Sequence, residues 1–94
     1  MSRNKAESRH LARIKAMDCI LCTLLGIPQT GVTDAHHIRT GRGMSQRSSD
    51  FLTIPVCHDG CHQGPGGIHG DRSMLKLAKV EEIDLLAETL SRLL

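Results

Sequence analysis

Apolar residues recur at helical spacing near both ends of the chain. Between residues 5 and 17 they stand three apart, which predicts a short amphipathic helix with this apolar stripe: Leu11, Ile14 and Met17. A second helix is expected over 81–94, and its stripe is formed by Ile83, Leu86, Ala87, Leu90 and Leu94. A shorter helix is expected just before it, over 71–78, and residues 79–80 would separate the two.

The middle of the chain has the character of a β-hairpin. Residues 32–38 and 51–56 are short segments that contain β-branched residues, so each is a strand candidate. Pro55 has no backbone N–H to donate, which places the second segment at a sheet edge or a strand end. Residues 39–50, rich in Gly, Ser and Arg, would join the strands as a loop. Upstream, a helical turn is expected over 23–27.

The composition indicates a small α+β domain that needs a staple. The chain has 94 residues, which is the length of one domain. It contains no Trp, no Tyr and a single Phe, so the large apolar volume that aromatic side chains normally supply is missing. A core this small is often held together by a metal ion or by disulfides.

Charge is divided unevenly along the chain. Residues 1–47 carry eight Lys or Arg against three Asp or Glu, whereas residues 48–94 carry four against seven. The basic half suits a polyanion such as nucleic acid, although a solvated helix face would give the same pattern. No apolar run approaches the roughly 20 residues of a membrane span, and the charged N-terminus lacks a signal-peptide core. We therefore expect a cytoplasmic protein with no membrane partner.

Two cysteine pairs flank the predicted hairpin: Cys19-x-x-Cys22 and Cys57-x-x-x-Cys61. In the reducing cytoplasm they indicate metal ligands before disulfides. Four thiolates make a closed tetrahedral zinc site, which is structural because no position is left for water. The second pair is one residue longer than the commonest spacing, so His58 or His62 is an alternative fourth ligand to Cys61. A redox role for the first pair would require a βαβ context, which the pattern does not show.

Five of the six histidines lie between residues 36 and 69. His36 and His37 are adjacent on a predicted strand, so their side chains should face opposite sides. Together with His62 and His69 they place four imidazoles beside an arginine-rich loop. A neutral imidazole can take a proton from water, a divalent ion can polarise a phosphate, and arginines stabilise its extra charge. Metal-assisted phosphodiester hydrolysis fits this set, and packing or surface histidines are the simpler alternative.

The order of these motifs resembles that of the HNH, or ββα-metal (His-Me finger), endonucleases with a cysteine-pair zinc knuckle. The matching parts are Ala-His-His-Ile on a strand, the hairpin, and Pro-Val-Cys followed by Cys-His and a later His. Cys-His-Gln-Gly-Pro, Gly-Ile-His-Gly-Asp and the Glu-Glu-Ile-Asp-Leu-Leu tail are similar to small bacteriophage and prophage nucleases, including the recombination-enhancing, RecA-dependent (Ref) type. The similarity covers about residues 17–94. It implies a zinc-stapled ββα-metal domain with an N-terminal helix and C-terminal packing helices.

The resemblance also implies roles for individual residues. His37 would be the general base, and a catalytic Mg²⁺ or Mn²⁺ would be held by the other site histidines: His36, His62 and His69. His69 would alternatively lie near the scissile phosphate. The structural zinc would be held by Cys19, Cys22, Cys57 and Cys61. Basic residues would contact DNA phosphates: Arg39, Arg42, Arg47 and Arg72. Cutting would leave a 3′-hydroxyl and a 5′-phosphate.

The resemblance implies a nuclease domain over 18–94, preceded by a basic helix or tail over 1–17. The substrate would be DNA in a bacterial host cell, with a RecA-type recombinase filament as a further partner. The rival functions are a non-catalytic, zinc-stabilised DNA-binding module and an adaptor for the recombinase filament.

Three features depart from the family pattern. The central Asn is absent, and Leu52 stands where it would fall; Asp50 and Thr53 are the candidates to replace it. The second cysteine pair is one residue long. His62 and His69 are farther apart than one helical turn, so both reach one metal only if the Gly-rich segment between them bends back.

Overall fold

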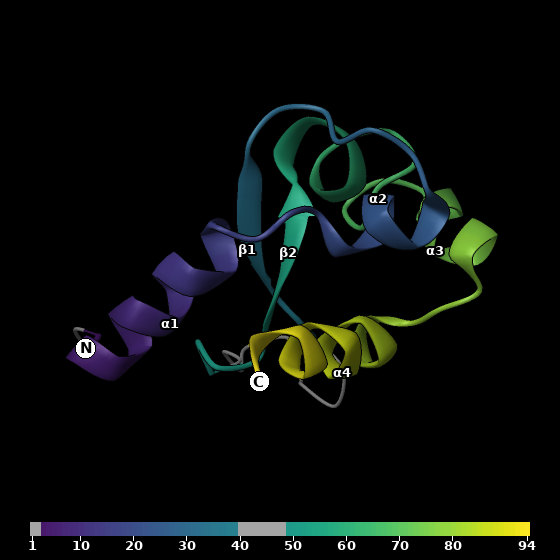
Figure 1. The fold of residues 1–94 in the computed structure, drawn as a ribbon. Helices are drawn as coiled ribbons and strands as arrows, with labels where there is room; N and C mark the ends of the chain where they lie inside the picture. The colour runs from purple at the N-terminus through teal and green to yellow at the C-terminus, as the bar shows by residue number, and fades with distance from the viewer. Residues whose placement is uncertain (1–2, 40–48) are drawn as a thin grey trace.

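The computed structural model describes residues 3–39 and 49–94 and has the expected α+β architecture (Figure 1). Within these stretches the elements follow in this order: α1 (Lys5–Lys15), α2 (Ile20–Leu25), β1 (Thr33–His37), β2 (Thr53–Cys57), a π-helical turn (His58–His62), α3 (Ser73–Ala78) and α4 (Glu82–Leu93). The sequence pattern predicted each α-helix and each strand to within a few residues. It did not predict the π-helical turn, called the π-turn below.

The helix ends follow from local hydrogen bonds and from residues in the left-handed conformation. Asn4 begins α1 with a capping box: its side-chain oxygen accepts the Glu7 N–H at 2.8 Å, and the Glu7 carboxylate accepts the Asn4 N–H at 3.0 Å. Gly26 ends α2 at φ 69°, a conformation that costs glycine little. Lys79, at φ 59°, separates α3 from α4, where the sequence predicted a break.

The two strands pair antiparallel, with Thr33 opposite Cys57 and His37 opposite Thr53. β2 begins two residues later than predicted, because residues 51–52 belong to the turn before it. In a two-stranded sheet both strands are edge strands, so Pro55 is accommodated within β2. All five residues of β2 are buried, which makes this strand the centre of the core.

The helices surround the hairpin (Figure 1). α1 contacts both strands, buries Ile14, and projects away from the body at its N-terminal end. α4 packs on β2 and α2, and its last turn meets α1, where Arg13 Nη2 donates to the Leu93 carbonyl at 3.1 Å. The core includes all four cysteines: Cys19, Ile20, Leu21, Cys22, Ile38, Ile54, Val56, Cys57, Cys61, Ile68, Leu75, Leu85 and Leu86. The cysteines thus stand in the core of a domain that lacks aromatic packing.

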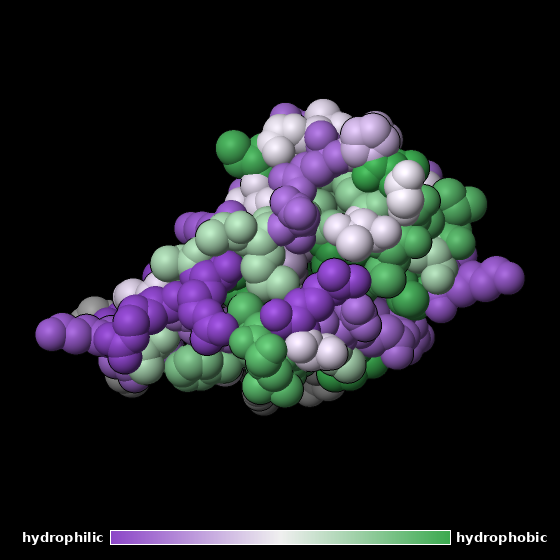
Figure 2. Space-filling view, in the orientation of Figure 1, coloured by the Kyte–Doolittle hydropathy of each residue, from purple (hydrophilic) through white to green (hydrophobic). Residues whose placement is uncertain are grey.

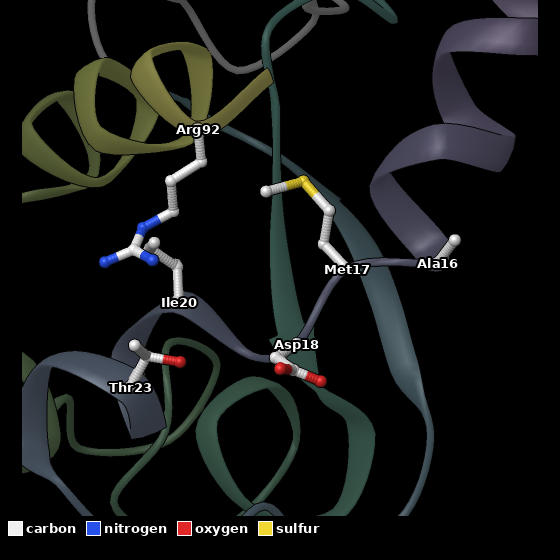
Figure 3. Close-up of a pocket in the computed structure, with 6 residues that line it drawn as sticks. All are labelled: Ala16, Met17, Asp18, Ile20, Thr23 and Arg92. Carbon is white, nitrogen blue, oxygen red and sulfur yellow. The ribbon is translucent and has the colours of Figure 1, made fainter. Parts of the chain in front are cut away.

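One face of the molecule carries hydrophilic and hydrophobic residues in different proportions over different elements (Figure 2). Hydrophilic side chains follow α1, whereas hydrophobic ones gather over α2 and α3. A hollow of about 470 Å³ lies between the α1–α2 linker and the last turn of α4 (Figure 3); its lining contains no cysteine and no histidine, and comprises Ala16, Met17, Asp18, Ile20, Thr23 and Arg92. Among the described helices, none combines the length and the apolar composition that crossing a membrane requires.

Candidate metal centres

All four cysteine side chains converge in the core. Their sulfur atoms lie within 4.8 Å of one another, and all four are buried free thiols. Cys22 Sγ lies 3.7 Å from Cys57 Sγ and 3.5 Å from Cys61 Sγ. A disulfide bond is only about 2.05 Å long, so no pair is bonded. Four Zn–S bonds of about 2.3 Å place neighbouring sulfurs ~3.8 Å apart in a tetrahedron, and the observed separations approach that value.

The two cysteine pairs are presented by matching turns. Cys19 precedes α2, and its Sγ accepts the Cys22 N–H at 3.4 Å. Cys57 precedes the π-turn, and its Sγ accepts the Cys61 N–H at 3.2 Å. A π-helix closes its hydrogen bond one residue later than an α-helix, so the π-turn takes up the extra residue of the second pair. Cys61 therefore reaches the other three sulfurs, and no histidine is needed as the fourth ligand.

The cysteine cluster cannot carry four negative charges without a cation. The pKa of Cys19 falls to about 5, chiefly because its sulfur is hydrogen-bonded by Cys61. Burial raises the pKa of Cys22 to about 12. The pKa of Cys61 is also raised, mainly by its hydrogen bond to Cys19. The Cys19 thiolate is thus stabilised while Cys22 and Cys61 stay protonated. Four buried sulfurs are the donor set of structural zinc, which would hold all four as thiolates.

Three histidines form a second group of ligand atoms, called the histidine triad below. His36 extends from β1, His62 ends the π-turn, and His69 follows in the Gly-rich segment. The three ring centroids lie 4.8, 5.0 and 5.1 Å apart. His36 is buried and His69 is exposed, so the triad opens to solvent on one side. The structure thus brings together the three histidines that were predicted as ligands.

His69 reaches the triad because the Gly-rich segment folds back over the π-turn. The His69 N–H donates to the His62 carbonyl at 3.0 Å. A Cβ atom at Gly67 would lie 2.6 Å from the Gly60 carbonyl oxygen, so only glycine permits this close approach. This bend brings His62 and His69 together although they are seven residues apart in sequence. Their spacing predicted that the two histidines share one metal only if the segment bends in this way.

Two carboxylates determine which nitrogens of His36 and His62 face each other. His36 Nε2 lies 2.5 Å from Glu82 Oε1, and His62 Nδ1 lies 2.8 Å from Asp34 Oδ2. An ionised carboxylate only accepts hydrogen bonds, so each neutral ring carries its proton on that nitrogen. The other nitrogens, His36 Nδ1 and His62 Nε2, face each other at 3.1 Å, each with a lone pair. Two lone pairs at this distance repel unless a cation or a proton lies between them.

A divalent ion fits the histidine triad. Metal–nitrogen bonds of about 2.0–2.1 Å hold neighbouring ligand nitrogens about 2.8–3.4 Å apart, from octahedral to tetrahedral angles. The 3.1 Å separation of His36 Nδ1 and His62 Nε2 lies within that range. Metal-bound imidazoles almost always donate their other N–H to a carboxylate, a carbonyl or water, as both of these rings do. Three ligands leave positions open for water or substrate, which a closed structural site does not.

Glu82 begins α4 and is only 6% exposed. The hydrogen bond from His36 is the main reason why the pKa of Glu82 lies below its ordinary value. Its other carboxylate oxygen accepts from Arg72 Nη2 at 3.3 Å. Arg72 was predicted as a phosphate contact; the structure places its half-exposed guanidinium next to the carboxylate that supports the triad.

Asp34 is shared between two histidines. Besides His62, its Oδ2 accepts from His58 Nδ1 at 2.6 Å. Burial alone would raise the pKa of Asp34, but the hydrogen bonds from His62 and His58 outweigh burial, and the pKa lies below its ordinary value. Asp34, His58 and His62 are close enough to form another ligand group. In that group, however, the nitrogen of His62 is Nδ1, which carries the proton and cannot bind a metal. The unprotonated Nε2 of His62 belongs to the triad.

His37, the predicted general base, faces away from His36, as strand alternation requires. Its Nε2 lies 2.7 Å from Asp50 Oδ1, and Asp50 Oδ2 accepts from Arg3 Nε at 2.6 Å. The hydrogen bonds from Arg3 and then from His37 lower the pKa of Asp50 from 3.8 to about 2. Asp50 is therefore ionised, the neutral His37 ring carries its proton on Nε2, and Nδ1 is the basic nitrogen. The His37 side chain is 37% exposed, so a substrate can approach it.

Both candidates for the role of the missing Asn lie at the loop end of the hairpin. Asp50 holds His37, and the Thr53 hydroxyl donates to the Asp50 carbonyl at 2.9 Å. The Ile38 N–H donates to the Leu52 carbonyl at 3.0 Å, which continues the hairpin beyond β1. Arg39, a second predicted DNA contact, is the next residue after Ile38. The other two, Arg42 and Arg47, lie outside the described residues.

The sequence did not indicate the carboxylates that accept hydrogen bonds from the site histidines. Neither Asp34 nor Glu82 was predicted as a site residue, and Asp50 was not predicted as the partner of His37. Asp34 carried a usable signal, since it stands two residues before His36 and therefore on the same face of a strand. Glu82 gave none, because its contact with His36 spans 46 residues of sequence. Comparisons of the chain with models of protein families, with curated proteins and with solved structures give no match.

Proposed function

We propose that this protein is a metal-dependent DNA endonuclease of the HNH type, which hydrolyses phosphodiester bonds. The observation that carries the proposal is the histidine triad at one side of β1 with His37, held by Asp50, directly after His36. His36 and His37 are the last two residues of β1, so the triad and the proposed base lie on opposite faces of the strand at the same end, where the phosphate would bind. The family resemblance of the sequence adds to the proposal and is independent of this geometry.

His37 would act as the general base. Asp50 keeps the proton on Nε2, so Nδ1 is free to accept a proton from an attacking water. Arg3 helps to hold Asp50 in place and ionised. A carboxylate behind an imidazole orients the ring and stabilises the charge that develops when it takes up a proton.

His36, His62 and His69 would hold the divalent ion. When bound, this ion would neutralise charge on the phosphate and stabilise the leaving oxygen. Imidazole ligands suit Zn²⁺, Fe²⁺ and Ni²⁺, whereas Mg²⁺ prefers oxygen and dehydrates reluctantly; Mn²⁺ also favours oxygen but belongs to the transition-metal series that binds nitrogen ligands. We therefore expect Mn²⁺ to support cutting at lower concentration than Mg²⁺. The cysteine cluster would hold a structural zinc throughout.

DNA binding would depend mainly on phosphate contacts. The described candidates are Arg72, next to Glu82, the exposed Arg39, two residues after His37, and the basic residues of α1. Phosphate contacts give affinity without reading sequence, so we expect weak sequence preference. Binding should also fall steeply as salt concentration rises.

His37→Ala distinguishes a nuclease from a DNA-binding module. Supercoiled plasmid and single-stranded circles would be incubated with Mg²⁺, Mn²⁺ or EDTA, with wild type, with His37→Ala and with His10→Ala as the matched control. We expect the loss of His37 to reduce nicking by about 10²–10⁴-fold, with unchanged DNA affinity and zinc content. DNA ligase should reseal the nicks, because their ends would be 3′-hydroxyl and 5′-phosphate.

Two results would count against this proposal. Equal nicking by wild type and His37→Ala would remove His37 from the mechanism or reveal a contaminant. Binding without cutting by the wild type, under all three conditions, would favour the non-catalytic module. Repeating that case with recombinase-coated DNA would test whether a partner is required, since cutting only on the coated substrate would fit a nuclease that is also a filament adaptor.

A further inference from the structure

We infer that Glu82 and Asp34 are positioning residues that set the affinity of the histidine triad for its cation. Each would hold the proton of one imidazole, on His36 and His62, so that the bare nitrogens face a common point. The inference rests on the proposed function in taking the triad as a cation site. It concerns residues that the sequence did not nominate and that touch neither the cation nor the substrate.

Glu82 is buried, and a buried carboxylate destabilises the fold unless it is hydrogen-bonded or paired with a positive charge. Its 6% exposure removes it from most solvent contact. Capping does not explain its position, because the capping box of α4 is made by its neighbour Glu81 with Asp84. Both Glu82 oxygens instead point to partners outside the helix: His36 at 2.5 Å and Arg72 at 3.3 Å. α4 thus supplies a carboxylate to β1.

Asp34 supports the second ring from the same strand as His36. Residues 34 and 36 share one face of β1, so the carboxylate and the His36 ring stand side by side along it. Asp34 is 29% exposed and divides one oxygen between His62 and the exposed His58. Its hold on His62 is therefore looser than that of Glu82 on His36, and we expect a smaller effect on cation affinity.

The physical effect would be on ring orientation and on nitrogen basicity. Without a carboxylate, each neutral imidazole would populate both tautomers, and one of them places a proton toward the cation. A bonded carboxylate excludes that tautomer and makes the opposite nitrogen a better donor. Loss of such a supporting group typically costs about 10–100-fold in metal affinity.

The first test reads the tautomers directly, before any cation binds to the triad. Long-range ¹H–¹⁵N spectra of the zinc-loaded protein, without other divalent ions, report which ring nitrogen carries the proton. We expect His36 to be protonated on Nε2 and His62 on Nδ1. Glu82→Leu should mix the tautomers of His36 and leave those of His62 unchanged. Asp34→Leu should mix those of His62 and of its other partner, His58, and leave those of His36 unchanged. Glu81→Gln, next to Glu82 but outside the site, is the matched control.

The second test measures Mn²⁺ binding by calorimetry on the same proteins. Glu82→Leu should weaken Mn²⁺ binding by about 10–100-fold and Asp34→Leu by less. Glu82→Gln, which keeps an acceptor oxygen without the charge, should recover part of the loss and serves if Glu82→Leu does not fold. Unchanged zinc content would show that the cysteine cluster is intact in each variant.

The outcomes separate the inference from the proposed function. Wild-type Mn²⁺ affinity and unmixed tautomers in Glu82→Leu and Asp34→Leu would overturn the inference and leave the triad as a cation site. Wild type that binds no Mn²⁺, as poorly as His62→Ala, would remove the proposed function. In that case the affinity part of the inference would fall with it.

Discussion

The cysteine cluster and the histidine triad share the π-turn but differ in their surroundings. Cys61 lies within this turn and His62 ends it, so neighbouring residues serve the two groups. The sulfurs are buried on all sides, and two of them accept backbone N–H bonds. The triad is open at His69 and is backed by side-chain carboxylates that come from β1 and α4.

This difference explains how one small domain can hold two kinds of metal site. A closed set of four thiolates leaves no position for exchange and contributes to folding. An open set of neutral imidazoles binds its cation more weakly and leaves positions for substrate. Because Cys61 and His62 are adjacent, a zinc bound by the cysteines would fix the backbone that carries one residue of the triad.

The largest expected effect comes from breaking the closed site. Cys61→Ser should lose zinc and unfold, because zinc binding to such domains is worth about 10–16 kcal/mol in apparent free energy. Circular dichroism and metal analysis of the purified variant would measure both losses. A zinc-free variant with native helix content would show that the apolar core alone is sufficient.

Removing His62 should affect only the open site. His62→Ala deletes one of three imidazoles, so we expect cation binding and nicking to fall beyond the about 10–100-fold loss typical of a supporting residue. Zinc content and thermal stability should stay close to those of Gln63→Ala, an exposed neighbour. Loss of zinc from His62→Ala would mean that the two groups are not independent.

Two glycines test the bend that brings His69 to the triad. Gly67→Ala would place Cβ 2.6 Å from the Gly60 carbonyl oxygen, and overpacking of this kind costs about 1–3 kcal/mol. Gly26→Ala meets no atom within 4 Å and pays only for its left-handed φ, about 1–2 kcal/mol. Urea unfolding should show both losses of stability. Only Gly67→Ala should also weaken Mn²⁺ binding, and equal Mn²⁺ affinities would contradict the role of the bend.

The smallest effect concerns Asp50 and the pH dependence of stability. Its pKa is lowered in the folded state from 3.8 to about 2. A carboxylate with a lowered folded pKa stabilises the fold above its ordinary pKa, and this contribution is lost as pH falls from about 4 to about 2. Wild type should therefore exceed Asp50→Asn in stability above about pH 4, and the gap should close toward about pH 2.

Urea unfolding of both proteins across this range measures the gap directly. The comparison is confined to pH values at which both proteins retain zinc, because release of zinc would itself unfold them. A gap that stays constant as pH falls would contradict the lowered pKa of Asp50.

Local patterns predicted the elements of this fold well. The apolar spacing of α1 and α4 and the helical turn before the hairpin depend on residues close in sequence, and each element appears where expected. The convergence of the four cysteines could also be predicted, because a four-cysteine zinc site requires both pairs to meet although they are far apart in sequence. The π-turn was missed, although the long gap between Cys57 and Cys61 was its signal.

The supporting carboxylates could not be predicted in the same way. Glu82 looks in sequence like a helix-start carboxylate, and only the packing of α4 against β2 turns it toward His36. Asp50 was noted as a substitute for an absent Asn, but its hydrogen bond to His37 depends on how the hairpin closes. These contacts are tertiary, so no local pattern encodes them.

The most direct test of the account is to measure DNA cutting by wild-type protein from which EDTA has removed any weakly bound divalent ion, while the zinc in the cysteine cluster is retained. Protein dialysed against EDTA should retain about one zinc per chain, since closed thiolate sites exchange slowly. It should not nick supercoiled plasmid in EDTA, and nicking should appear when Mn²⁺ is added. Nicking in EDTA, or none at any Mn²⁺ concentration while zinc remains bound, would contradict the assignment of a structural and a catalytic metal site.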